Sequence, residues 1–288
     1  MEFSESLFKI YKEFDESISK KVQGKIYHYT SPEGFESILR NKNLHFTDRR
    51  FLNDKNESGY IRKFFYENAN YFTTKMNCTI EDYEWAFEQS FYAYNHGTVG
   101  FFLCSFSLDK DNLSLWNYYT KGDKIAGYNI GFNIAELIKE KYDDYYMHGK
   151  VIYSDKKKLE IVDRTIDILL SSVDDKKNIL KGDLFLIIHK LVFISAFFKE
   201  KCFKVENEYR FIIIKGITEQ EDNRILFKVR NGIFIPYIEY SFTNKAIADI
   251  FVSPTIDKLM AESSLETLMN VYNIPGKNIY FSNVPVRY

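Results

Sequence analysis

Three strand-like runs follow one another late in the chain: VENEYRFIII at 205–214, RILFKVR at 224–230 and GIFIPYIEY at 232–240. β-Branched and aromatic residues dominate them, and no helical pattern separates them. Nearer the N-terminus, strands and helical stripes do not alternate in regular βαβ units. This order argues against a doubly wound parallel sheet and predicts an α+β fold.

The rest of the chain supplies both kinds of element. Apolar residues at three- or four-residue spacing predict helices, and short β-rich runs predict strands. The expected helices are 3–21, a helix from Ser31 to near Asn43, 57–72, 80–95, 111–119, 156–172, 182–201 and 256–272. The expected further strands are 25–29, 44–47, 98–107, 128–133, 150–154, 248–252 and 278–282. We read residues 1–288 as a single domain with an N-terminal helix at 3–21 and a helical insertion at about 155–201.

Composition narrows the class of protein. The net charge of −1 gives no basic field for non-specific nucleic-acid binding. Three cysteines without a CxxC spacing argue against a disulfide framework or a zinc site and favour a reducing, cytoplasmic setting. No apolar run approaches the roughly 20 residues of a membrane span, so no membrane association is expected. Five histidines show no metal-ligand spacing, so no metal is expected.

Several common catalytic motifs are absent from the sequence. There is no GxxxxGK[ST] phosphate loop, no GxGxxG after a strand, no HExxH and no GxSxG elbow. These absences argue against P-loop NTPases, Rossmann oxidoreductases, zincins and α/β-hydrolases.

The first candidate segment is IYHYTS at 26–31, where a strand runs directly into a helix. Ser31 can cap that helix and Pro32 suits its first turn. The helix N-terminus would favour an anionic group such as a phosphate, with His28 nearby. The structural alternative is a histidine that bonds a backbone carbonyl at a strand end.

Two loops supply further candidates. In FTDRRFLNDKNE at 46–57, Arg50 could hold a phosphate through its planar fork, or the loop could simply make turns and cap the next helix. In FSLDKDNLSLWNYYTKGDKIAGYNIGF at 106–132, Tyr118 or Tyr119 could stack on a flat ligand ring, although aromatics at helical spacing more often belong to a core.

The fourth candidate is the charged start of VENEYRFIII. Glu206, Glu208 and Arg210 are two residues apart, so a strand would place them on one face, followed on that face by Ile212 and Ile214. Buried charges are costly unless they are paired or functional. The structural alternative is a Glu–Arg pair.

Together these segments resemble a bacterial family, the domain of unknown function 2971. The resemblance is carried by IYHYTS at 26–31, LNDKNE at 52–57, FSLDKDNLSLWNYY at 106–119 followed by GYNIGF at 127–132, KVIYS at 150–154 and ENEYRF at 206–211. These blocks span about residues 25–215. Their order is more specific than any single block.

That family is similar in layout to ADP-ribosyltransferases of the His–Tyr–Glu type. The resemblance implies a split pair of small, mostly antiparallel sheets flanked by helices, with NAD bound between them as substrate. It implies that Glu208 stabilises the charge developing on the ribose and that Glu206 orients or deprotonates the acceptor. His28 would hydrogen-bond the adenine-side ribose or the carboxamide, and Tyr118 or Tyr119 would stack on nicotinamide.

The same resemblance places Tyr29 and Thr30 beside His28 in the NAD site and gives Arg50 the pyrophosphate. We therefore expect ADP-ribosyl transfer to a protein or nucleic-acid acceptor, as in a bacterial toxin or a phage-defence effector. The sequence leaves open whether a partner protein restrains the activity. The alternatives are a non-catalytic module that senses a nucleotide or a partner on the same fold, and nucleic-acid processing through the loop arginines, which the near-neutral charge disfavours.

Overall fold

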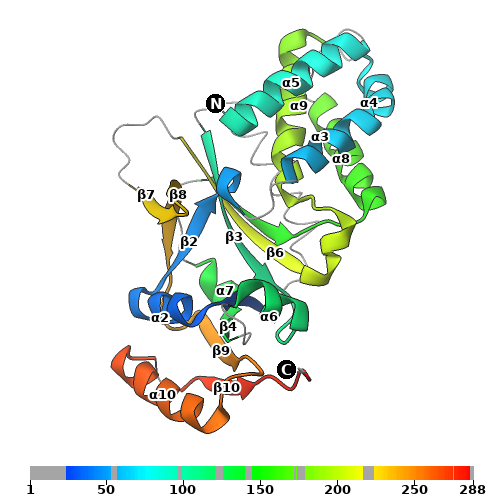
Figure 1. The fold of residues 1–288 in the computed structure, drawn as a ribbon. Helices are drawn as coiled ribbons and strands as arrows, with labels where there is room; N and C mark the ends of the chain where they lie inside the picture. Colours follow the sequence, from blue (N-terminus) through cyan, green and yellow to red (C-terminus); the bar gives the residue numbers. More distant parts are fainter. Residues whose placement is uncertain are drawn as a thin grey trace.

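The computed structural model shows a large sheet with helices on both of its faces (Figure 1). The helix expected at 3–21 lies outside the residues that the structure describes. The described residues are 24–52, 57–96, 99–120, 126–139, 145–171, 173, 179–216, 224–274 and 276–285.

The described strands join into one ten-stranded sheet. Its ladders are antiparallel except for the parallel pair β9–β10. The mixed α and β composition and the mostly antiparallel pairing confirm the broad fold class. The strands are β1 (Lys25–Thr30), β2 (Asn43–Asp48), β3 (Val99–Ser107), β4 (Tyr128–Asn133), β5 (Tyr145–Lys150), β6 (Glu208–Gly216), β7 (Ile225–Arg230), β8 (Ile233–Ser241), β9 (Ile247–Val252) and β10 (Asn278–Phe281).

Strand β3 is the point where the sheet divides. One of its edges pairs with β6 from Val99 to Ser107. The other edge is shared, because β1 joins it at Ser107 and β2 joins it at Leu103. From there one arm continues as β1, β4, β9 and β10, and the other as β2, β8 and β7.

The expectation of two separate small sheets was therefore wrong. A nine-residue strand is long enough to hold a different neighbour at each end of one edge, so β3 links both arms into a single sheet. The division between the arms nevertheless leaves a fork between β1 and β2.

Two groups of helices cover opposite faces of the sheet. A helical lobe of α3, α4, α5, α8 and α9 stands at one end (Figure 1). The other face packs against α2, α7 and α10. The helices are α2 (Pro32–Asn41), α3 (Glu57–Glu67), α4 (Ala69–Met76), α5 (Ile80–His96), α6 (Leu113–Tyr119), α7 (Ile134–Leu137), α8 (Asp155–Leu170), α9 (Lys181–Ile194) and α10 (Lys258–Val271), with the 3₁₀ turns η1 (Arg49–Phe51), η2 (Ser195–Phe197) and η3 (Lys201–Glu206).

The helical segment expected as an insertion shares its core with earlier helices. Ile187 and Ile188 of α9 are buried in the same cluster as Phe87 of α5. That cluster also takes in Leu103 of β3 and Ile212 of β6. The helical lobe is thus built from two stretches of chain, 57–96 and 155–194, and it buries one end of the β3–β6 face.

The start of α2 follows the capping rules. Ser31 accepts a hydrogen bond on Oγ from Gly34 N at 3.2 Å, and Pro32 occupies the first turn. Both features confirm the prediction from IYHYTS. Lys42, in the left-handed conformation with φ 53°, ends the helix.

Two local predictions need correction. The helix expected over 57–72 is two helices, because α3 ends at Glu67 and α4 begins at Ala69. The strand expected at 150–154 was wrong, since β5 ends at Lys150, opposite Tyr209. Strand β6 begins at Glu208, one residue before Tyr209, so residues beyond Lys150 have almost no strand to pair with. Among the described helices, none is long and apolar enough to cross a membrane.

Candidate functional site

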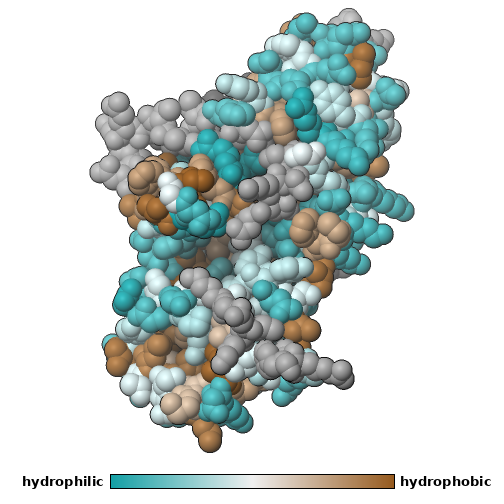
Figure 2. Space-filling model, viewed as in Figure 1, coloured by the Kyte–Doolittle hydropathy of each residue, from teal (hydrophilic) through white to brown (hydrophobic). Residues whose placement is uncertain are grey.

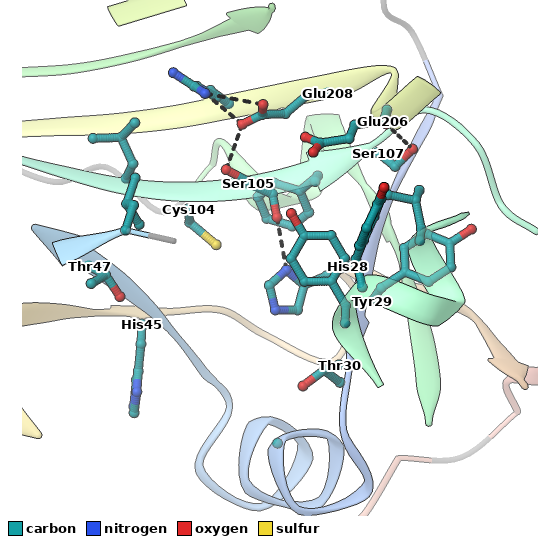
Figure 3. A pocket seen from close by; sticks show the side chains of 18 of the residues that line it. His28, Tyr29, Thr30, His45, Thr47, Cys104, Ser105, Ser107, Glu206 and Glu208 are labelled. Atoms are coloured by element: carbon teal, nitrogen blue, oxygen red, sulfur yellow. Dashed lines mark hydrogen bonds and ion pairs between the residues drawn. The ribbon is translucent and has the colours of Figure 1, made fainter. Parts of the chain in front are cut away.

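A cavity of about 820 Å³ opens in the fork between β1 and β2. Its lining comes from β1, α2, β2, η1, β3, α6, η3, β6 and β7, with Leu52 and Lys199 from the segments between elements. Figure 3 shows side chains from these segments turned toward a common space. Its volume lies within the range of ordinary small-molecule sites, about 300–1,000 Å³.

Most residues predicted from the sequence line this cavity. Segments far apart in the chain thus meet in one place, which sequence reasoning proposed but could not demonstrate. Arg50 is the exception and is not part of the lining. The predicted residues found there are His28, Tyr29, Thr30, Tyr118, Tyr119, Glu206 and Glu208.

His28 is fixed in one tautomer. Its Nδ1 lies 3.0 Å from the backbone carbonyl of Ser105. A carbonyl only accepts, so Nδ1 carries the proton and Nε2 keeps its lone pair. Burial lowers the pKa of His28, which keeps the ring neutral. The residue therefore offers an acceptor to a ligand hydroxyl or amide.

Glu208 is held by four donor atoms on three residues. Arg210 donates from Nε at 2.6 Å and from Nη2 at 3.2 Å, Ser105 from Oγ at 2.6 Å, and Lys199 from Nζ at 3.1 Å. Burial alone would raise the pKa of Glu208, but Arg210 and Lys199 bring it down to about 2. Its carboxylate is thus permanently ionised and fully occupied, since a carboxylate offers about four acceptor positions.

Contrary to the prediction, Glu206 does not lie on the strand with Glu208 and Arg210. It is the last residue of η3, and Asn207 follows with φ 43°, so Glu206 is not on the strand face that carries Glu208 and Arg210. Asparagine tolerates this left-handed conformation better than most residues. The turn nevertheless returns Glu206 to the cavity, where Lys199 Nζ lies 2.6 Å from its carboxylate. Burial raises the pKa of Glu206 despite that partner.

We call these five residues the acidic wall: Ser105, Lys199, Glu206, Glu208 and Arg210. Its two carboxylates and two cations have opposite and equal formal charge. Ser105 also joins it to His28, because its backbone accepts from the ring while its hydroxyl donates to Glu208 (Figure 3). The Glu–Arg pair weighed as a structural alternative is present, inside the cavity lining.

The aromatic residues play unequal parts. Tyr29 is buried and packs edge-on against Trp116 at 4.8 Å. Its hydroxyl donates to the Asp109 carbonyl and accepts from Asn112 N, so it anchors the loop that leads into α6. This anchored loop leads into α6, whose residues Leu115, Tyr118 and Tyr119 line the cavity.

Tyr118 and Tyr119, at the end of α6, form part of the cavity rim. They are 66% and 39% exposed, respectively, which leaves ring surface accessible to a ligand. Thr30 lines the cavity at the end of β1. A Cβ at Gly34 would lie 2.2 Å from Thr30 Oγ1, so a larger residue there would displace this side chain.

Arg50 is paired with Asp48. Its guanidinium forms an ion pair with the buried carboxylate of Asp48 at 2.5 Å, and Asp48 also accepts from the Arg50 backbone at 3.0 Å. This contact follows from the turn η1, which begins directly after β2. The role of Arg50 as a pyrophosphate ligand stays a prediction.

A second polar wall of the cavity was not predicted. We call it the basic wall: His45 and Thr47 of β2 with Lys228 and Arg230 of β7. Lys228 Nζ donates to Thr47 Oγ1 at 3.0 Å. The signal was present in ILFKVR, because residues two apart share a strand face. Val229, which lies between them, is 66% exposed. Figure 2 shows an apolar patch over β7 and β8.

Ser105 and Lys199 were also missed. Ser105 lies in the apolar run TVGFFLCSFS, and Lys199 follows a helix rich in Ile, Leu and Phe. Neither has a distinctive local pattern, and only the pairing of β3 with β6 brings Ser105 opposite Arg210. Within the described ranges, no group of three His, Cys, Asp or Glu residues is placed to hold a metal ion.

Comparison with known proteins gives one match. Neither the curated proteins nor the solved structures contain a match to the chain. The matched region begins within α6 and ends in the first half of β6, so it contains Lys199, Glu206, Glu208 and Arg210 of the acidic wall but not Ser105 or His28. The family that the chain matches is the one described as protein of unknown function (DUF2971), over residues 115–211, about a third of the chain.

Proposed function

We propose that the chain is an ADP-ribosyltransferase that uses NAD as its substrate and a protein or nucleic acid as its acceptor. One observation carries the proposal: His28, the Tyr118–Tyr119 pair, Glu206 and Glu208 line a single cavity of about 820 Å³. These are the positions that a His–Tyr–Glu layout requires to converge. A nucleotide-sized ligand suits a cavity of this volume.

The charges of the acidic wall suit the proposed chemistry. The nicotinamide–ribose bond breaks with its electron pair leaving on nicotinamide, so positive charge develops on the ribose. Ionised carboxylates beside that ribose stabilise the charge. An acceptor oxygen or nitrogen then bonds to the ribose carbon and gives its proton to a base.

The contacts favour Glu206 over Glu208 as the acid that meets the reactants. Glu208 already accepts from four donor atoms, whereas Glu206 has one side-chain partner, Lys199, in the described structure. The raised pKa of Glu206 also suits proton transfer better than the value of about 2 for Glu208. We therefore assign acceptor deprotonation to Glu206 and the positioning of Lys199 and Ser105 to Glu208.

His28 has a matching role. Its neutral ring presents Nε2 as an acceptor, and both a ribose hydroxyl and the amide of nicotinamide are donors. A charged imidazole would lose this acceptor. The tilted Phe106 ring at 5.4 Å packs beside His28 and limits its movement. Tyr118 or Tyr119 would cover the flat nicotinamide ring from the rim.

The test is nicotinamide release from NAD by the full chain, with and without a cell extract that supplies acceptors. Glu206→Gln should lower the rate about 100-fold or more, the range for loss of a general base. Glu160→Gln, an exposed acid on α8, is the matched control and should leave the rate unchanged. No nicotinamide release by the wild-type protein would refute the proposal.

Glu208→Gln is a second variant to test in the nicotinamide-release assay. This change disturbs a buried ion pair, so the variant must first be shown to fold. A folded Glu208→Gln protein that keeps full activity would remove Glu208 from the mechanism.

A second candidate is a non-catalytic module that binds a nucleotide in the same cavity. The full occupancy of Glu208 by Arg210, Ser105 and Lys199 favours it, because that carboxylate has no acceptor position left for a ribose. Such a module would be stabilised against heat by NAD or ADP-ribose. Stabilisation without release of nicotinamide would select this candidate.

A further inference from the structure

The basic wall differs from the rest of the cavity because its cation Lys228 has no counter-charge among the described residues. Lys228 Nζ donates to the neutral Thr47 hydroxyl at 3.0 Å and lies 5.4 Å from the Tyr237 ring centre. No carboxylate lies within ion-pair distance of Lys228 among the described residues. The side chain is partly buried, and an ammonium group leaves water at a cost unless it is paired.

Its surroundings add positive charge. Arg230 lines the cavity from the same strand and donates from Nη2 to the Phe51 carbonyl at 2.6 Å. His45, also in the lining, stacks near Tyr237 and pairs weakly with Glu239 at 3.7 Å. Burial and the neighbouring Arg230 charge both lower the pKa of Lys228, as expected for a cation that lacks an anion.

The strand register separates this wall from the acidic wall. Thr47 pairs with Leu103 on β3, whereas Glu208 pairs with Ser107. Four residues of antiparallel strand span about 13 Å. A ligand that reaches from Thr47 to Glu208 is therefore extended, longer than a free phosphate or a single sugar.

We propose that Lys228, with Thr47 and Arg230, forms the phosphate-binding end of the cavity. The ligand is a phosphate-bearing nucleotide whose phosphates lie on the basic wall and whose far ribose reaches the acidic wall. The inference rests on the proposed function for the identity of the nucleotide, but the anion site itself does not depend on turnover. It gives the phosphate role to Lys228 instead of Arg50, whose guanidinium is bound to Asp48.

The ammonium and the hydroxyl supply complementary chemistry. Lys228 has two further N–H donors beyond the one given to Thr47, and a phosphate oxygen would take them as charge-assisted bonds. Lys228 lies within strand β7, so the anion would meet a charge carried by a strand and not by a mobile loop. This arrangement holds the phosphate end of the ligand at a fixed distance from Glu206.

The test compares binding of inorganic pyrophosphate, AMP and adenosine to the full chain by calorimetry. The wild-type protein should bind pyrophosphate, and AMP more tightly than adenosine. Lys228→Met keeps the apolar stem but removes the charge, and it should weaken pyrophosphate and AMP binding about tenfold or more while leaving adenosine unchanged. Lys156→Met, an exposed lysine on α8, is the control and should bind like the wild type.

The outcomes separate this inference from the proposed function. Pyrophosphate binding lost in a folded Lys228→Met protein supports the anion site even if NAD is never consumed. No binding of pyrophosphate by the wild type, or equal binding by Lys228→Met, overturns it. NAD consumption with the same KM in Lys228→Met would overturn the anion site while the enzymatic proposal stands.

Discussion

The two polar walls of the cavity use charge in different ways. In the acidic wall, Glu208 and Arg210 are 3% and 1% exposed, and Lys199 bridges both carboxylates. In the basic wall, Lys228 is only partly buried and meets a neutral hydroxyl. The carboxylates of the first wall are paired with cations within the protein, whereas Lys228 in the second has no carboxylate within ion-pair distance among the described residues.

We expect this difference to separate charges that support the fold from charges that bind a ligand. A buried ion pair contributes little net stability, but removal of one partner leaves an uncompensated charge and is strongly destabilising. Lys228 has no carboxylate partner among the described residues, so its removal leaves no uncompensated charge there. Substitutions should therefore affect folding on one side of the cavity and ligand binding on the other.

The largest expected effect is on stability at the acidic wall. Arg210→Met should lower the free energy of unfolding by about 3–5 kcal/mol, because Glu208 loses two donor contacts and the Ala196 carbonyl loses one. Lys228→Met should change it by less than about 1 kcal/mol. Urea unfolding measures both. Equal losses in the two variants would show that the walls do not differ in this way.

A smaller effect should appear in how the free energy of unfolding depends on pH, because Glu206 titrates. Its pKa is raised in the folded protein, so its contribution to stability is fully present below the ordinary value of about 4.3. That contribution is lost as pH rises through the raised value. The stability of the wild type relative to Glu206→Gln should therefore fall as the pH rises above about 4.3.

Urea unfolding of both proteins over a series of pH values gives the comparison. Glu206→Gln cannot titrate, so groups shared by the two proteins cancel in the difference. A difference that stays constant, or one that grows with pH, would contradict the raised pKa.

Local signals predicted much of the fold. The strand at 25–30 and the capped helix after it follow from β-rich residues, then Ser31 and Pro32, all within a few positions. The strand YNIGFN at 128–133 was placed to the residue for the same reason. By contrast, the joining of both arms through β3 depends on long-range pairing that no local pattern encodes.

The same division applies to the candidate site. His28 and Glu208 stand out because polar residues are unusual in otherwise apolar strands. Ser105 does not stand out, since a serine in a strand is common and its role arises from the register with Arg210. Arg50 was chosen because its loop is rich in charge, but Asp48 two residues earlier supplies a partner.

Lys228 was overlooked because the strand RILFKVR was read for its apolar residues alone. Its alternation places Lys228 and Arg230 on one face, which was visible in the sequence. What was not visible is that this face borders the same cavity as Glu208, because β7 reaches it only through β8 and β2.

A crystal structure of the protein with ADP-ribose bound tests the central claim most directly. We predict phosphate oxygens within about 3 Å of Lys228 Nζ and the far ribose beside Glu206. A ligand bound outside the fork between β1 and β2, or one with its phosphates against Glu206 and its ribose at Lys228, would contradict the account.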